Sequence, residues 1–262
     1  MNFDSILYST KDEIATITLN VPSKFNVFNE TMSRNILAAL EVAEEDDNIK
    51  VIIINANGKA FSGGGDIGEM LKAMEEGRVV FGTTADLISQ ISRNIIKSKK
   101  PVIASVAGAV AGAAFNIALA CDFCIAADNA KFMQSFVNIG VIPDAGGLYL
   151  LTRAVGINKA RHLTMLGTPV TAEEGKDLGF VYQVCLMEDL APETEKLAVQ
   201  LAQGPAKSYE LIKSLVYASQ FDTYERYTEK EIASQVACGY TQDYKEGIRA
   251  FYEKRIPVFR GK

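Results

Sequence analysis

Short apolar runs that alternate with amphipathic stretches constrain the fold of this chain more than any other feature of its sequence. Two amphipathic stretches, residues 29–45 and 87–97, repeat their apolar side chains with the period of a helix. Strand-like runs occupy residues 15–19, 51–55, 101–106 and 123–126. Because strands and helices alternate along the chain, the sequence predicts a layered α/β fold.

The chain changes character after about residue 190. Helical patterns continue from there without a strand-like run between them, at residues 193–202, 206–219, 224–239 and 243–254. We therefore expect a core of residues 1–192 and a helical region of residues 193–262. Apolar side chains are expected on exposed faces of that region, at Leu211, Leu215, Phe221 and Phe251. Exposed apolar faces are typical of surfaces that join subunits.

Composition excludes several classes of protein. With 262 residues, 48% of them hydrophobic, the chain can bury a large core, and its net charge of −5 argues against a surface for nucleic acid or anionic lipid. The longest apolar stretch, residues 104–120, is too short to span a bilayer. The first residues resemble neither a signal peptide nor a transit peptide, so we expect a cytoplasmic protein.

The four cysteines do not complete a metal site. Cys121 and Cys124 have the spacing of half a zinc site, but neither a second pair nor a nearby histidine accompanies them. We expect buried reduced thiols rather than a metal or a disulfide. The only histidine, His162, lies away from every motif, so a Ser-His-Asp or Cys-His mechanism has little support.

One carboxylate stands alone in an apolar run. Asp144 is the only acidic residue within residues 132–152. An acid among apolar side chains is partly desolvated, which raises its pKa and suits it to proton transfer. The position after Pro143 is also typical of a helix N-cap, whose side chain binds a helix N–H. On position alone the cap is favoured, because caps far outnumber catalytic acids.

A glycine-rich loop follows the strand-like run at residues 51–55. Three successive glycines within residues 61–66 let the backbone approach a ligand and direct N–H groups at it. Gly63, Gly65 and Gly68 also fit GxGxxG, which would indicate dinucleotide binding. In that motif the first glycine directly follows the strand, whereas several residues intervene here. A surface loop without a ligand is the other interpretation.

Small residues also precede the apolar helix expected at residues 113–120. Within residues 108–116 they would leave the first N–H groups of that helix unpaired and facing a pocket. Such a helix start can bind an oxyanion. Tight helix packing explains the small residues equally well.

Taken in order, these segments resemble the crotonase (enoyl-CoA hydratase/isomerase) superfamily. The resemblance covers essentially the whole chain and is carried by residues 61–67, 108–116, 121–122 and 140–147, with supporting matches at residues 20–26, 166–174, 179–181 and 246–255. It implies a ClpP-like spiral of strand-strand-helix units that forms two roughly perpendicular sheets, followed by a helical trimerisation region. It further implies a homotrimer, in which two trimers can pair into a hexamer.

The resemblance also implies a ligand and the residues that contact it. Members bind an acyl thioester of coenzyme A or acyl carrier protein and need no other cofactor. Their two oxyanion-binding N–H groups correspond to Gly65 and Ala113. Lys24 would meet the phosphates of the carrier, and Phe251 and Lys254 would reach the ligand of a neighbouring subunit, although each lysine also fits a solvated surface charge. The remaining expected contacts are Gly63, Gly64, Asp66, Ile67, Met70 and Phe136.

The departures from the family pattern bear on the reaction. Hydratases of the superfamily activate water with two glutamates, and this chain has Asn116 and Phe136 at those positions. Neither side chain is a general base, and Phe136 would repel water. Asp144 falls where several isomerases of the superfamily, and a dehalogenase, carry their acid. One carboxylate with a raised pKa can shift a double bond alone.

Several stretches look most like the trans-2-decenoyl-[acyl-carrier-protein] isomerases of Gram-positive bacteria, which make a cis-3 product in fatty acid synthesis. Four alternatives stay open. One is a hydratase that relies on Asp66 or on a water held by Asn116. The others are an isomerase of fatty acid degradation, a nucleotide-dependent oxidoreductase and a non-catalytic thioester-binding protein.

Overall fold

Two β-sheets form the centre of the molecule. The structure is a computed structural model that describes residues 3–220 and 223–259. The strands are β1 Ile6–Lys11, β2 Ile14–Leu19, β3 Val51–Ala56, β4 Val102–Val106, β5 Ala109–Ala111, β6 Phe123–Ala127, β7 Lys131–Met133, β8 Val170–Thr171 and β9 Gln183–Cys185. Within the described residues the larger sheet has six strands, in the order β1-β2-β3-β4-β6-β9, and the smaller has three, in the order β5-β7-β8.

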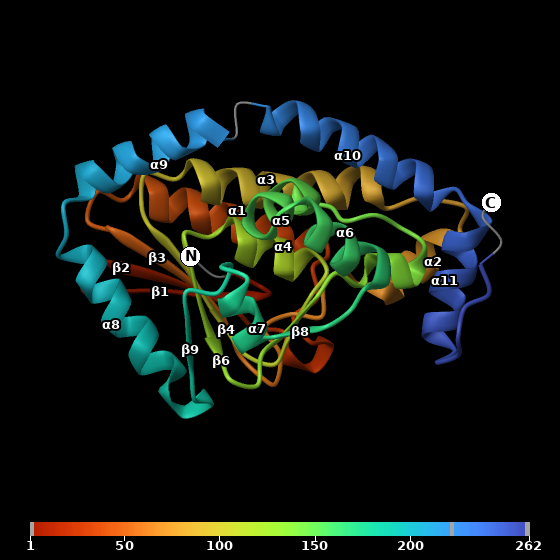
Figure 1. Cartoon of the computed structure of the whole chain (residues 1–262), viewed down its shortest axis with the longest axis horizontal. Helices are drawn as coiled ribbons and strands as arrows, with labels where there is room; N and C mark the ends of the chain where they lie inside the picture. The colour runs from red at the N-terminus through yellow and green to blue at the C-terminus, as the bar shows by residue number, and fades with distance from the viewer. Residues whose placement is uncertain (1–2, 221–222, 260–262) are drawn as a thin grey trace.

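Helices cover both faces of the larger sheet. The α-helices of the described residues are α1 Glu30–Glu45, α2 Ile67–Glu75, α3 Phe81–Lys97, α4 Ala113–Ala120, α5 Gly147–Val155, α6 Ile157–Leu166, α7 Ala172–Asp177, α8 Leu190–Ala202, α9 Ala206–Gln220, α10 Tyr224–Gly239 and α11 Gln242–Tyr252. Short 3-10 helices lie at Pro22–Lys24, Ser135–Ile139 and Met187–Asp189. Figure 1 shows α8 along one face of the larger sheet and α1 and α3 on the other. The layered α/β fold is confirmed.

Alternation along β3 explains why this strand reads as a continuous apolar run. Ile52 and Ile54 pack into the core that includes α1, α3 and α4, whereas Val51 and Ile53 pack into a second core beneath α8. Successive side chains of a strand point to opposite faces, so a strand buried on both faces is apolar at every position.

The helix predicted at residues 87–97 begins six residues earlier than expected. α3 starts at Phe81, and its buried positions Phe81, Ala85 and Ile88 continue the helical stripe upstream. The polar residues between them hid this turn from the sequence. β1 was also missed, whereas the helices at residues 113–120 and 224–239 are confirmed at both ends.

The C-terminal helices do not form a separate layer. α8 contacts β3, β4 and β6, α10 runs along α3, and α11 contacts α2 (Figure 1). The boundary predicted at residue 193 falls within α8, and that division remains a prediction. α9 buries none of its described residues, and Leu211, Leu215 and Phe251 are exposed as expected. Phe221 lies outside the described residues.

Two further predictions can be compared with the fold. Of the four cysteines, all free thiols, only Cys124 is fully buried, so the expectation of burial is wrong in part. The others lie nearer the surface because they sit at strand and helix ends. Across residues 3–220 and 223–259, no helix combines the length and the apolar character that crossing a membrane requires.

Candidate active site

A cavity of about 260 Å³ lies where the two glycine-rich segments meet the loop that carries Asp144. Its walls come from distant parts of the chain, including the loop before α2, the start of α4, the 3-10 helix at Ser135–Ile139, α10 and α11. Among the described residues that line it, Asp144 is the only one with an acidic or basic side chain. The fold therefore encloses the lone acid of the apolar run in a mostly apolar space.

The environment of Asp144 favours its neutral form. The residue is 7% exposed, and its Oδ1 has no hydrogen-bond partner among the described residues. Burial raises the pKa of Asp144 from its ordinary value of 3.8 to about 7, and the amide of Asn116 offsets part of this rise. No cationic side chain from the described part of the chain lines the cavity, so hydrogen bonds replace only part of the hydration that the carboxylate loses on burial. The group is thus able to take up and release a proton near neutral pH.

The alternative role of Asp144 as a helix cap is wrong. α5 begins at Gly147, its N-cap is Gly146, and no side chain caps the helix. Ala145 and Gly146 both adopt left-handed backbone angles, with φ of 53° and 73°. These two residues turn the chain before the helix starts, so Asp144 lies too far upstream for its side chain to serve as the cap.

Asn116 holds the backbone beside the acid. Its Nδ2 donates to the main-chain carbonyl of Asp144 at 2.9 Å, and its Oδ1 accepts from Nε2 of Gln134 at 2.7 Å. Both polar atoms of this fully buried amide are therefore engaged. The hydratase interpretation that relies on a water held by Asn116 loses its support.

The two glycine-rich segments lie side by side. Ser62 pairs with Val110 in a parallel bridge, and a Cβ at Gly64 would lie 2.8 Å from the carbonyl oxygen of Ala111. Gly64 also has φ of +90°, which side-chain-bearing residues rarely adopt. The contact requires glycine there, and it brings Gly65 next to the start of α4.

Two N–H groups remain available at this junction. Within residues 3–220 and 223–259, the main-chain N–H groups of Gly65 and Ala113 have no hydrogen-bond partner. Ala113 is the first residue of α4, where the helix dipole favours negative charge. Gly65 lines the cavity, and so does Gly112, which directly precedes Ala113.

The other predicted contact residues divide into two groups. Gly63, Ile67, Met70, Phe136 and Phe251 line the cavity together with Asp144. Phe136 is 8% exposed, and its ring lies 3.6 Å from the position of a Cβ at Gly112. Phe251 lines the cavity of its own chain, and its contact with the ligand of a neighbouring subunit stays a prediction.

The predicted contact residues with polar side chains lie outside the cavity. Asp66 is the N-cap of α2, and its Oδ1 accepts from the N–H of Glu69 at 3.1 Å, so it is poorly placed as a base for water. Lys24 borders a shallow surface groove that Asp66 also lines. Lys254 is exposed beyond α11. His162 lies on the exposed side of α6, away from the cavity.

Two residues near the acid escaped the sequence analysis. Glu231 and Gln235 of α10 are 4% and 0% exposed, and both bind the main chain of the loop around Asp144. They stand in a helix that reads as an ordinary amphipathic segment about ninety residues downstream of the acid. Nothing in their spacing indicates that they meet this loop.

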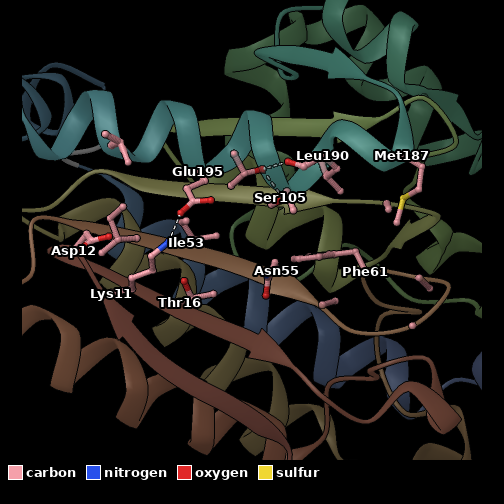
Figure 2. Close-up of a pocket in the computed structure, with 18 residues that line it drawn as sticks. Lys11, Asp12, Thr16, Ile53, Asn55, Phe61, Ser105, Met187, Leu190 and Glu195 are labelled. Carbon is pink, nitrogen blue, oxygen red and sulfur yellow. Dashed lines mark hydrogen bonds and ion pairs between the residues drawn. The ribbon is translucent and has the colours of Figure 1, made fainter.

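A second cavity, of about 330 Å³, lies between the larger sheet and α8. Figure 2 shows Asn55 and Ser105 of the sheet facing α8, and Lys11 joined to Glu195 across the space. Ser105 also shares a hydrogen bond of 2.8 Å with Thr194. None of the predicted site residues lines this cavity, so the cavity that contains Asp144 is the candidate active site.

Comparisons with known proteins agree with this geometry. The family model described as "Enoyl-CoA hydratase/isomerase" matches residues 9–262. A Streptococcus mutans protein named "Trans-2-decenoyl-[acyl-carrier-protein] isomerase" is 45% identical over the full length of both chains. The Escherichia coli "1,2-epoxyphenylacetyl-CoA isomerase" is 34% identical over 98% of each chain. A crystal structure of an enoyl-CoA hydratase from Mycobacterium avium subsp. paratuberculosis superposes with a TM-score of 0.90 at 29% identity, covering 99% of this chain and 100% of that one.

Proposed function

This chain is an enzyme of the enoyl-CoA hydratase/isomerase family, and from that premise we propose that it moves the double bond of a 2-enoyl thioester to the 3 position. One observation carries the proposal. Asp144 is the single acidic or basic side chain among the described residues around the cavity, and burial raises its pKa to about 7. A double-bond shift needs one group that both removes and returns a proton.

In the proposed reaction, Asp144 is the only group that carries a proton. The ionised carboxylate removes a proton from C4 of the substrate, and the electrons of that C–H bond form the C3–C4 double bond. The former C2–C3 π electrons move toward the thioester and leave a negative charge on its oxygen. Asp144 then returns the proton to C2. No water is consumed, and no cofactor besides the thioester carrier takes part.

The N–H groups of Gly65 and Ala113 are the proposed oxyanion donors. Neither has a hydrogen-bond partner among the described residues, and both belong to segments that meet at the cavity. Each such donor contributes on the order of a hundredfold in rate when it is aimed at developing charge. They stabilise the enolate oxygen that forms when Asp144 removes the proton.

Hydration is disfavoured by the residues at the two positions where hydratases of the family carry glutamates. Asn116 uses both of its polar atoms to hold other groups, and Phe136 presents an apolar ring to the cavity. A hydratase must position and deprotonate water, and neither side chain can do so.

The relatives and the surface support more specific proposals for the substrate and the assembly. The name of the Streptococcus mutans relative supports a decenoyl chain on acyl carrier protein, a trans-2 to cis-3 shift and a role in fatty acid synthesis. Lys24 beside its surface groove is the proposed contact for the carrier phosphates. The exposed Leu211 and Leu215 of α9 support association of subunits, and we propose a homotrimer that can pair into hexamers.

Purified protein incubated with trans-2-decenoyl thioesters of acyl carrier protein and of coenzyme A tests the proposal. We expect loss of the conjugated enoyl absorbance and formation of cis-3-decenoyl product, identified by chromatography and mass. A product heavier by one water would indicate a hydratase instead. Binding of both thioesters without any product would indicate a non-catalytic protein.

A further inference from the structure

α10 contacts the loop of the proposed catalytic acid on both sides of that acid. Glu231 Oε2 accepts a hydrogen bond from the N–H of Gly146 at 2.6 Å. One helical turn later, Gln235 Oε1 accepts from the N–H of Ile142 at 3.0 Å. Residues 142 and 146 flank Asp144 at equal distance in sequence, so the two side chains hold the loop at two points.

The loop needs such support because its backbone conformation is unfavourable. Ala145 has φ of 53°, a left-handed conformation that disfavours a residue with a Cβ. Its carbonyl accepts from the hydroxyl of Tyr224, also on α10, at 3.0 Å. A conformation of this kind persists only when the surroundings impose it.

Stability alone does not explain a carboxyl group at position 231. Burial raises the pKa of Glu231 to about 8, the N–H of Gly146 offsets part of the rise, and the charge of Asp144 adds to it. A hydrogen bond with the hydroxyl of Tyr227 also lowers the pKa of this carboxyl group, although less than burial raises it. An apolar side chain of similar size would avoid the desolvation of a buried acid.

Unpaired polar atoms gather around the same loop. Among the described residues, Glu231 Oε1, Gln235 Nε2 and Asp144 Oδ1 are buried without a hydrogen-bond partner. Buried polar atoms of native proteins are nearly always paired, so three exceptions around one loop call for a functional reason. Gln235 also lines the cavity that contains Asp144.

We propose that Glu231 and Gln235 are positioning residues, which fix the direction of the Asp144 carboxyl group by holding the N–H groups of Gly146 and Ile142. The inference rests on the proposed isomerase function. It assigns to the C-terminal helix α10 a direct part in the geometry of catalysis. Positioning of a catalytic group affects the chemical step more than substrate binding.

Isomerisation of trans-2-decenoyl coenzyme A by wild type, Glu231→Met and Glu231→Gln tests the inference. Methionine matches the length of glutamate but accepts no comparable hydrogen bond, so kcat is expected to fall about tenfold to a hundredfold while KM stays within about threefold. Glutamine keeps an acceptor at the same place, so its kcat is expected within about threefold of wild type. A melting temperature of Glu231→Met at or above that of wild type separates lost activity from lost folding.

Thr228→Val is the matched control. Thr228 is 1% exposed on the same helix, and its hydroxyl donates only to the carbonyl of Glu225, at 3.0 Å, among the described contacts. Its kcat is expected to match wild type. Gln235→Leu removes the second contact and serves as the second variant should Glu231→Met not fold.

The outcomes separate the inference from the function on which it rests. A wild-type protein that forms no 3-decenoyl product from either the acyl carrier protein thioester or the coenzyme A thioester would defeat the proposed function. An active wild type with an unchanged kcat in folded Glu231→Met, or in folded Gln235→Leu, would overturn the inference. Equal losses in Glu231→Gln and Glu231→Met would overturn it too, because the effect would then not follow the hydrogen-bond acceptor.

Discussion

The side-chain amide of Asn116 donates a hydrogen bond to the main-chain carbonyl of Asp144 at 2.9 Å. The same carbonyl accepts from the N–H of Gly147 at 2.8 Å. A Cβ at Gly147 would lie 2.3 Å from Asn116 Cγ, so the glycine leaves room for the amide. A position that carries a glutamate in hydratases of the family thus supports the backbone of the proposed acid here.

Asn116→Glu is expected to lose isomerase activity without gaining hydratase activity. The longer side chain has no room beside Gly147 and cannot donate to the carbonyl of Asp144, and an unpaired buried group costs about 1–3 kcal/mol. Product analysis by mass after incubation with trans-2-decenoyl coenzyme A checks this. Asn158→Glu on the exposed side of α6 is the control. Appearance of a 3-hydroxyacyl product would contradict the prediction.

Asp144→Asn is expected to lower kcat by about a hundredfold or more, because the amide cannot remove a proton. The fold and thioester binding should remain, since the amide has nearly the shape of the acid. Single-turnover product formation and thioester binding by calorimetry measure the two effects separately. Asp128→Asn, in the exposed turn between β6 and β7, should retain full activity. An active Asp144→Asn enzyme would remove this residue from the mechanism.

The rate should depend on the ionisation of Asp144. Because the carboxylate must be ionised to act as a base and its pKa is raised to about 7, kcat/KM is expected to rise as pH increases through about 7 and then to level off. A steady-state profile in buffers of constant ionic strength checks the position of this limb. A profile without such a rise would show that another group, or an unperturbed carboxyl, limits the reaction.

Replacing Glu231 with glutamine should stabilise the protein, and more so at higher pH. The folded-state pKa of Glu231 is raised from 4.5 to about 8, so the folded protein holds this proton more tightly than the unfolded chain. That contribution to stability is complete below the unfolded pKa and is lost as pH rises through the folded pKa. Each pH unit in this window is worth up to about 1.4 kcal/mol.

Urea denaturation of wild type and Glu231→Gln at several pH values measures this difference. We expect similar midpoints near pH 4.5 and a growing advantage of the variant toward pH 8. Asp144 is present in both proteins, so its own titration largely cancels. An advantage that is independent of pH would mean that the pKa of Glu231 is not raised by folding.

The elements that the sequence predicts correctly are those whose residue pattern is complete within one short segment. The helix at residues 113–120 is apolar with small residues before it, and its bounds are correct. The start of α3 was missed because Gly82, Thr83 and Thr84 interrupt the apolar pattern between Phe81 and Ala85. The capping role of Asp144 was wrong because a left-handed turn at residues 145 and 146 delays the helix.

The lone acid of the apolar run was recognisable because its contrast with its neighbours is visible in the sequence. Glu231 and Gln235 could not be recognised in this way. In the sequence of an amphipathic helix, a glutamate and a glutamine look like ordinary surface residues, and only the packing of the helix shows that they are buried. Only the packing of α10 along α3 turns them toward the loop. Long-range contacts of this kind leave no periodic signal.

The contacts between α10 and the Asp144 loop join segments that are made at different times during synthesis, because α10 lies far downstream of the loop. A growing chain can complete both sheets and both glycine-rich segments before Tyr224 leaves the ribosome. At that stage the N–H groups of Ile142 and Gly146 still lack their acceptors. The two acceptors of α10 therefore become available only after Glu231 and Gln235 have been made. If the proposed positioning role is correct, proteolytic removal of α10 would inactivate the protein although Asp144 is still present.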